Sequence, residues 1–183
     1  MHNQSIPDIE KQTLAWVRQV VVGLNLCPFA NAVVKSDELA LFTEPNSQFE
    51  PVLTSLVQQC DTLRGASSQS TLLFILPNGF TDFDVYLDLV STAEALLVDL
   101  DYEGILQIAS FHPDYQFEGA PVDDMANYTN RSPYPMLHLL KEAAVERVIE
   151  QHPGTQAIPD RNIDLLRSMS LEQLTSLINK EQH

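Results

Sequence analysis

Residues 127–138 include side chains suited to binding a small anion. Arg131 has a planar guanidinium, a group that binds carboxylates and phosphates through two parallel hydrogen bonds. Ser132 is a favourable N-cap residue and Pro133 a favourable first helical residue, so the pair predicts a helix that begins here. The unpaired N–H groups at the start of such a helix attract anions. Asn130, Arg131 and Ser132 are therefore candidate anion-binding residues.

Two histidines are candidate proton carriers for chemistry on that anion. His112 follows a predicted strand, at the kind of strand end where sheet proteins bind ligands, and His138 lies in the second turn of the predicted helix. The unperturbed pKa of imidazole lies nearest neutrality, so either residue is a candidate general acid or base. Asp114 is placed to orient an imidazole, and Tyr115 to contact the ligand. Each histidine alone is more commonly structural, whereas together with Arg131 the two predict one cluster.

Cys27 and Arg161 are weaker candidates. Cys27 follows the C-terminal end of a predicted helix, whose negative partial charge disfavours a thiolate, so a nucleophilic role needs a nearby histidine or arginine. Arg161 is either a second arm of the anion site or a structural partner of an aspartate such as Asp114. Cys27, Asp114 and the two histidines have metal-binding chemistry but lack the spacing of paired Cys-x-x-Cys motifs. We assign no metal site.

The overall charge limits the class of partner. The 183 residues include 10 basic and 25 acidic side chains, for a net charge of −15, and residues 36–130 contain 16 acids but a single base, Arg64. Such a field repels nucleic acid and anionic membranes, so we expect neither as a partner. The apolar runs are too short to cross a bilayer and the first residues do not resemble a signal peptide. We therefore expect a cytoplasmic protein, and two cysteines do not make a disulfide framework.

Hydrophobic periodicity predicts alternating helices and strands. Apolar residues at helical spacing predict helices over 7–24, 49–63, 82–100, 133–150, 162–168 and 171–179. Short apolar runs predict strands over 71–76 and 104–111, and a hairpin or bent strand over 32–35 and 39–43. The alternation is typical of right-handed crossovers between parallel strands. We predict a single domain of the α/β or α+β class, with a small mixed, mainly parallel sheet of about three to four strands packed with helices.

Residues 112–131 interrupt this pattern. The segment is polar, rich in turn-forming residues and too long for an ordinary connection. Loops of this kind are disproportionately functional. A polar stretch such as Asn-Tyr-Thr-Asn-Arg can equally fix a loop by satisfying its own hydrogen bonds.

Four segments of the chain resemble a bacterial family of uncharacterised proteins of this length, DUF1415. They are GLNLCPFA at 23–30, ASFHPDYQF at 109–117, NYTNRSPYP at 127–135 and IPDRN at 158–162. The resemblance covers nearly the full chain and implies that these segments are hallmarks of the family. It implies no activity, cofactor or catalytic residue.

Two functions are compatible with the sequence. The first is a cytoplasmic enzyme or ligand-binding domain for a small anion such as a carboxylate or phosphate ester, bound by Arg131 and acted on by His112 or His138. The second is a non-catalytic interaction or assembly protein whose polar 112–135 segment is structural. The sequence identifies neither a cofactor nor an oligomeric state.

Overall fold

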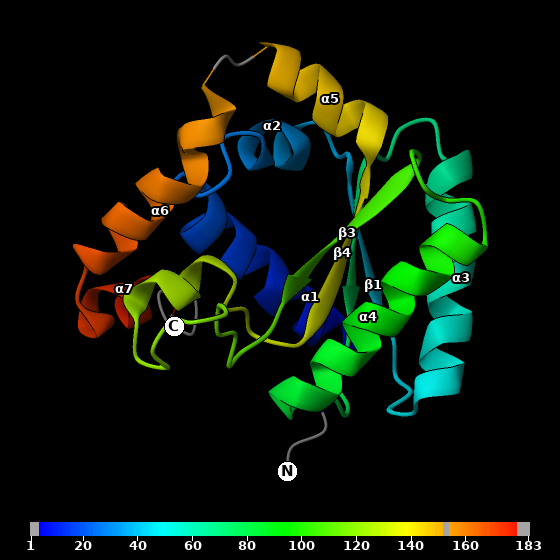
Figure 1. Cartoon of the computed structure of the whole chain (residues 1–183), viewed down its shortest axis with the longest axis horizontal. Coiled ribbons are helices and arrows are strands. Elements are labelled where there is room, and N and C mark those ends of the chain that lie inside the picture. Colours follow the sequence, from blue (N-terminus) through cyan, green and yellow to red (C-terminus); the bar gives the residue numbers. More distant parts are fainter. Residues whose placement is uncertain (1–3, 152–153, 179–183) are drawn as a thin grey trace.

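Four strands form one mixed sheet at the centre of the molecule (Figure 1). The computed structural model describes residues 4–151 and 154–178. The strands are β1 (Leu39–Thr43), β2 (Thr71–Ile75), β3 (Leu106–Phe111) and β4 (Met136–Lys141), in the spatial order β1-β2-β4-β3. The β1 strand is parallel to β2, whereas β4 is antiparallel to both β2 and β3. The carboxyl ends of β1, β2 and β3 therefore meet at one edge of the sheet.

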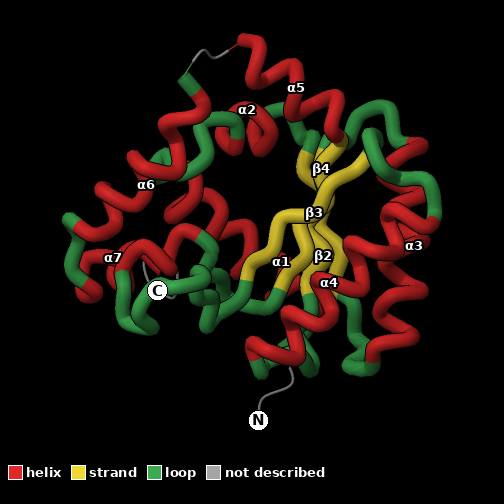
Figure 2. Tube along the Cα trace, in the orientation of Figure 1, coloured by secondary structure: helices red, strands yellow, loops and turns green. Residues whose placement is uncertain are grey.

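Helices cover both faces of the sheet (Figure 2). One face packs against α3 (Phe49–Gly65) and α4 (Phe83–Asp99). The other packs against α1 (Ile6–Trp16), the π-helix η1 (Val17–Val22) that continues it, and the C-terminal helices α6 (Ile158–Arg167) and α7 (Leu171–Ile178). The remaining helical elements are α2 (Ala30–Lys35), η2 (Met125–Thr129), α5 (Glu142–Gln151) and η3 (Thr155–Ala157).

The β2 strand shows why the sheet is buried on both faces. All five of its residues are buried. Leu72 and Phe74 join the core beneath α3 and α4, whereas Leu73 and Ile75 join the core beneath α1 and η1. Successive side chains of a strand point to opposite faces, so a continuous apolar run is the pattern of a strand covered on both sides. The predicted small mixed sheet packed with helices is confirmed.

Two predicted elements are wrong. Residues 136–141 form β4, and the helix predicted from residue 133 begins only at Glu142. Ser132 is consequently not an N-cap, and Pro133 does not open a helix. The apolar run of residues 136–141 suits a buried strand as well as a helix. Pairing with β2 and β3 makes it a strand. Residues 32–35 lie in α2 rather than in a strand.

No helix in the described ranges is both long enough and apolar enough to cross a bilayer.

Candidate functional site

The polar segment predicted as a site lies over the carboxyl end of β3 and is closed by its own hydrogen bonds. The His112 N–H donates to the Asn130 carbonyl (3.1 Å), and the Ser132 N–H donates to the His112 carbonyl (3.4 Å). The Asn130 side-chain amide donates to the carbonyl of Ser110 in β3 (3.0 Å). The two ends of the 112–135 segment are thereby fixed to each other and to the sheet.

His112 is completely buried, and both of its ring nitrogens are occupied. Its Nε2 lies 2.9 Å from the Phe80 carbonyl oxygen, and its Nδ1 accepts the Asp114 backbone N–H (3.0 Å). Because a carbonyl only accepts, the proton is on Nε2 and the imidazole is neutral. Burial between the Phe83 and Tyr86 rings lowers the pKa of His112. Asp114 does orient the imidazole, through its main chain rather than its carboxylate.

Arg131 binds the segment's own carbonyl groups. Its Nε donates to the Tyr115 carbonyl (3.1 Å) and its Nη2 to the Val122 carbonyl (2.8 Å). Its guanidinium carbon lies 4.5 Å from the centroid of the Tyr128 ring, a cation–π contact. The buried Asn127 side chain also bonds to main-chain groups of this segment. It accepts from the Phe117 N–H (3.1 Å) and donates to the Pro121 carbonyl (2.8 Å).

Ser132 and Tyr115 are also engaged within this segment. The Ser132 hydroxyl donates to the Tyr134 carbonyl (2.6 Å). The Tyr115 ring packs edge-on against Phe83, and its hydroxyl lies 3.4 Å from the Ser110 hydroxyl. The sequence predicted a helix N-terminus at Ser132, but the next element is the β4 strand.

His138 lies on the opposite face of the sheet from His112. It is paired with Leu73 and Ala109 in the middle of β4 and contacts the Phe111 ring beneath α1, whereas the His112 ring contacts α4. The predicted cluster of both histidines with Arg131 is therefore not formed.

A threonine hydroxyl fixes the protonation of His138. The Thr71 Oγ1 lies 2.5 Å from the His138 Nε2 and donates its single proton to the Leu139 carbonyl (2.8 Å). The imidazole must therefore donate to the hydroxyl, with its proton on Nε2. Burial lowers the pKa of His138 to about 4.

This lowered pKa predicts a loss of stability in mild acid. The unfolded chain protonates the histidine near the ordinary imidazole pKa of 6.5, whereas the folded chain resists protonation until about pH 4, so the stabilisation is complete above pH 6.5 and decreases as the pH falls. From pH 6.5 to 5 the free energy of unfolding should fall by about 2 kcal/mol on account of His138. Urea unfolding at several pH values measures this, and His138→Gln should flatten the dependence. An identical pH dependence in the variant would contradict it.

A second set of contacts joins Arg161 to the segment that contains Cys27. The Arg161 Nη1 donates to the Asn25 carbonyl (2.7 Å), and the buried Asn162 side chain donates to the Leu26 carbonyl (2.7 Å). Arg161 thus donates to the main-chain carbonyls of Leu24 and Asn25, which follow η1, and it forms no ion pair with Asp114. Cys27 is a half-buried free thiol in this segment.

Tyr86 is the structural residue that the sequence analysis missed. Its hydroxyl accepts the Phe111 N–H (3.0 Å) and donates to the Met136 carbonyl (2.7 Å), so it bridges the ends of β3 and β4. Burial raises the pKa of this hydroxyl. Tyr86 shares the buried face of α4 with Leu89 and Ala93, and a buried tyrosine needs a hydrogen-bond partner. The helical spacing of Tyr86 with Leu89 and Ala93 was the feature of the sequence that could have identified it as a buried residue.

The four segments noted in the sequence form two contacting pairs in the structure. Segment 109–117 is bonded to 127–135, and segment 23–30 is bonded to 158–162. A model of the family described as a protein of unknown function, DUF1415, matches residues 8–176. The chain belongs to the DUF1415 family. No curated protein and no solved structure matches this DUF1415 chain.

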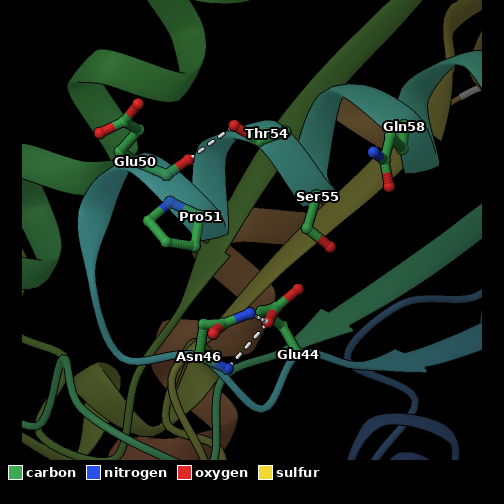
Figure 3. Close-up of a pocket in the computed structure, with 7 residues that line it drawn as sticks. All are labelled: Glu44, Asn46, Glu50, Pro51, Thr54, Ser55 and Gln58. Atoms are coloured by element: carbon green, nitrogen blue, oxygen red, sulfur yellow. Dashed lines mark hydrogen bonds between the residues drawn. The ribbon is translucent and has the colours of Figure 1, made fainter.

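A hollow of about 440 Å³ lies at the carboxyl end of β1 of this DUF1415 protein, beside the first turns of α3 (Figure 3). It is lined by Glu44, Asn46, Glu50, Pro51, Thr54, Ser55 and Gln58. None of these residues was a candidate from the sequence. Within the described chain, no group of three or more His, Cys, Asp or Glu residues could hold a metal ion.

Proposed function

We propose that this DUF1415 protein is a non-catalytic interaction or assembly protein, in which the 112–135 segment supports the fold. The observation that supports this most directly is that the Arg131 guanidinium and both ring nitrogens of His112 bond to main-chain groups of the protein. His112 is completely buried with both ring nitrogens satisfied, so it offers nothing to a ligand, and the two bonds of the half-buried Arg131 fix its guanidinium to the segment.

The competing proposal is an enzyme or ligand-binding domain for a small anion. It requires an imidazole next to the Arg131 guanidinium and helix N–H groups beside Ser132. The two histidines lie on opposite faces of the sheet, and Ser132 precedes a strand. The geometry therefore favours the interaction protein. We place it in the cytoplasm, because its two free cysteines, Cys27 and Cys60, are typical of a reducing compartment.

Replacing Arg131 distinguishes the two proposals. If Arg131 is structural, Arg131→Ala should lower the free energy of unfolding by about 2 kcal/mol, because two carbonyl groups lose a charged donor and Tyr128 loses its cation–π contact. Denaturant unfolding measures the change. Arg18→Ala, at an exposed position on η1, is the matched control and should change stability by less than about 0.5 kcal/mol.

The same variant tests the anion receptor directly. Thermal shifts of the wild-type protein with phosphate, citrate and pyrophosphate should be small and should be equal in Arg131→Ala. A stabilisation by any of these anions that disappears in an otherwise stable Arg131→Ala protein would overturn the proposal.

A further inference from the structure

The carboxylate of Glu44 is the one feature of the hollow that needs explanation. Glu44 is only 2% exposed, although its side chain is charged. Its Oε1 accepts two hydrogen bonds from Asn46, one from the backbone N–H (2.8 Å) and one from the side-chain amide (2.6 Å). It forms no ion pair with any residue in 4–151 or 154–178. Buried charges in proteins are ordinarily paired with an opposite charge.

The second oxygen of Glu44 faces the hollow. None of the described residues donates a hydrogen bond to Oε2, and Figure 3 shows this oxygen turned toward Ser55 on α3. Asn46 fixes the carboxylate, because its backbone N–H and one of its side-chain N–H groups both donate to Oε1. A rigid, buried carboxylate with one free oxygen is a preorganised acceptor for a charged donor.

The other polar groups that line the hollow carry no formal charge apart from Glu50, and the Ser55 hydroxyl and the Gln58 amide can both donate and accept. The Thr54 hydroxyl donates its proton to the Glu50 carbonyl (2.8 Å), which leaves only its lone pairs for a ligand. The bonds from Asn46 to Glu44 use its backbone N–H and one side-chain N–H, and leave its amide oxygen and its second side-chain N–H. The group that complements the Glu44 carboxylate is therefore a cation with N–H donors, since the neutral groups beside it can bond to N–H groups as well.

The N-terminal end of α3 opposes a cation only weakly. A helix N-terminus has a partial positive charge worth about 0.3–1 kcal/mol at an exposed site. Glu50 lies in the first turn of α3, and its negative charge partly cancels the positive charge of the helix N-terminus. Its carboxylate points away from Glu44 (Figure 3). The buried Glu44 carboxylate is therefore the dominant charge inside the hollow.

We propose that the hollow binds an ammonium group at the end of an alkyl chain, with Glu44 Oε2 as its counter-ion. This inference rests on the proposed function, since it assigns the binding role to a place other than the 112–135 segment. The ammonium belongs either to a free alkylamine or to a lysine side chain of a basic partner. A basic partner also complements residues 36–130, which contain 16 acids and one base.

The test is an NMR titration of the ¹⁵N-labelled full chain at physiological ionic strength, where long-range attraction is screened within about 8 Å. The probes are cadaverine, a short glycine–serine peptide with one lysine, and pentanol as the uncharged control. We expect shifts at residues 44–58 with cadaverine or the peptide and none with pentanol. Cadaverine alone would identify a free amine, the peptide alone a lysine of a partner, and both a site for the ammonium group itself.

Two matched pairs of variants separate the hollow from the general acidity of the protein. Glu44→Gln should weaken binding about tenfold or more, because it removes a charged hydrogen bond, whereas Glu103→Gln removes the same charge from an exposed loop and should have little effect. Thr54→Lys places a competing ammonium beside the hollow and should abolish binding. Thr62→Lys is its control, since Thr62 is exposed on the same helix and makes the same hydrogen bond to the carbonyl four residues earlier.

Three results would overturn the inference: no shifts at residues 44–58 with either amine, equal shifts with pentanol, or equal losses in the members of each pair. Thr54→Lys alters an exposed position, so it keeps the test valid if Glu44→Gln does not fold. Failure of the proposed function would appear separately, as anion binding that depends on Arg131.

Discussion

The His112→Ala variant is expected to lose about 4 kcal/mol of unfolding free energy, the largest effect of any single change at the predicted site. The ring fills space between Phe83 and Tyr86, and its removal leaves a cavity in a fully buried position. The Phe80 carbonyl and the Asp114 N–H also lose their partner. Urea unfolding followed by circular dichroism measures the loss.

The His112→Phe variant separates packing from hydrogen bonding. Phenylalanine refills most of the space but bonds to neither main-chain group, so we expect it to recover about half of the loss. A catalytic His112 would behave differently, because its replacement would leave stability nearly unchanged. A loss below about 1 kcal/mol in His112→Ala would therefore contradict a structural role.

The Tyr86→Phe variant should destabilise the protein by about 3 kcal/mol although it removes a single oxygen atom. The hydroxyl bridges the Phe111 N–H and the Met136 carbonyl in the interior, and each buried group left without a partner costs about 1–3 kcal/mol. Amide hydrogen exchange should show the lost protection at Phe111, and denaturant unfolding gives the total loss.

Tyr102→Phe is the matched control for this change. The Tyr102 ring is also buried, but its hydroxyl donates to the carboxylate of Asp61, whose side chain is 54% exposed. Water can replace the lost hydroxyl there, so we expect a loss of about 1 kcal/mol or less. Equal losses of unfolding free energy in the two variants would show that the Tyr86 bridge between β3 and β4 contributes no more to stability than the hydrogen bond of Tyr102.

The helices and strands that depend on local pattern could be predicted from the sequence. Asp82 caps α4 through its carboxylate, which accepts the N–H groups of Asp84 and Val85 (3.0 and 3.1 Å), and a capping residue before an apolar stripe is visible in the sequence. The buried strand β2 was predicted for a similar reason, since its apolar run is short and bounded by turn-forming residues.

The β4 strand could not be predicted in this way, because its identity depends on partners elsewhere in the chain. The spacing of Leu137, Leu140, Ala144 and Val148 matches a helix, and Ser132-Pro133 resembles a helix start. The β2 and β3 strands bond to both edges of residues 136–141 and override that local preference.

The partners of the candidate site residues could not be predicted for a related reason. A sequence displays the guanidinium of Arg131, but it does not display the carbonyl groups of Tyr115 and Val122 that bind it, since every residue has a carbonyl. Glu44 escaped notice because one acid among 25 has no distinguishing pattern until its burial is known.

The place of β4 in the sheet has a consequence for biosynthesis. It is the last strand to leave the ribosome, yet it lies between β2 and β3, and in the described sheet it is the only neighbour of β3. A nascent chain that ends before residue 136 has a β1–β2 pair and an unpaired apolar β3, a species prone to aggregation. We therefore expect β3 to stay unpaired during synthesis until residues 136–141 have emerged, and a truncation that removes β4 to leave β3 without its neighbour in the sheet.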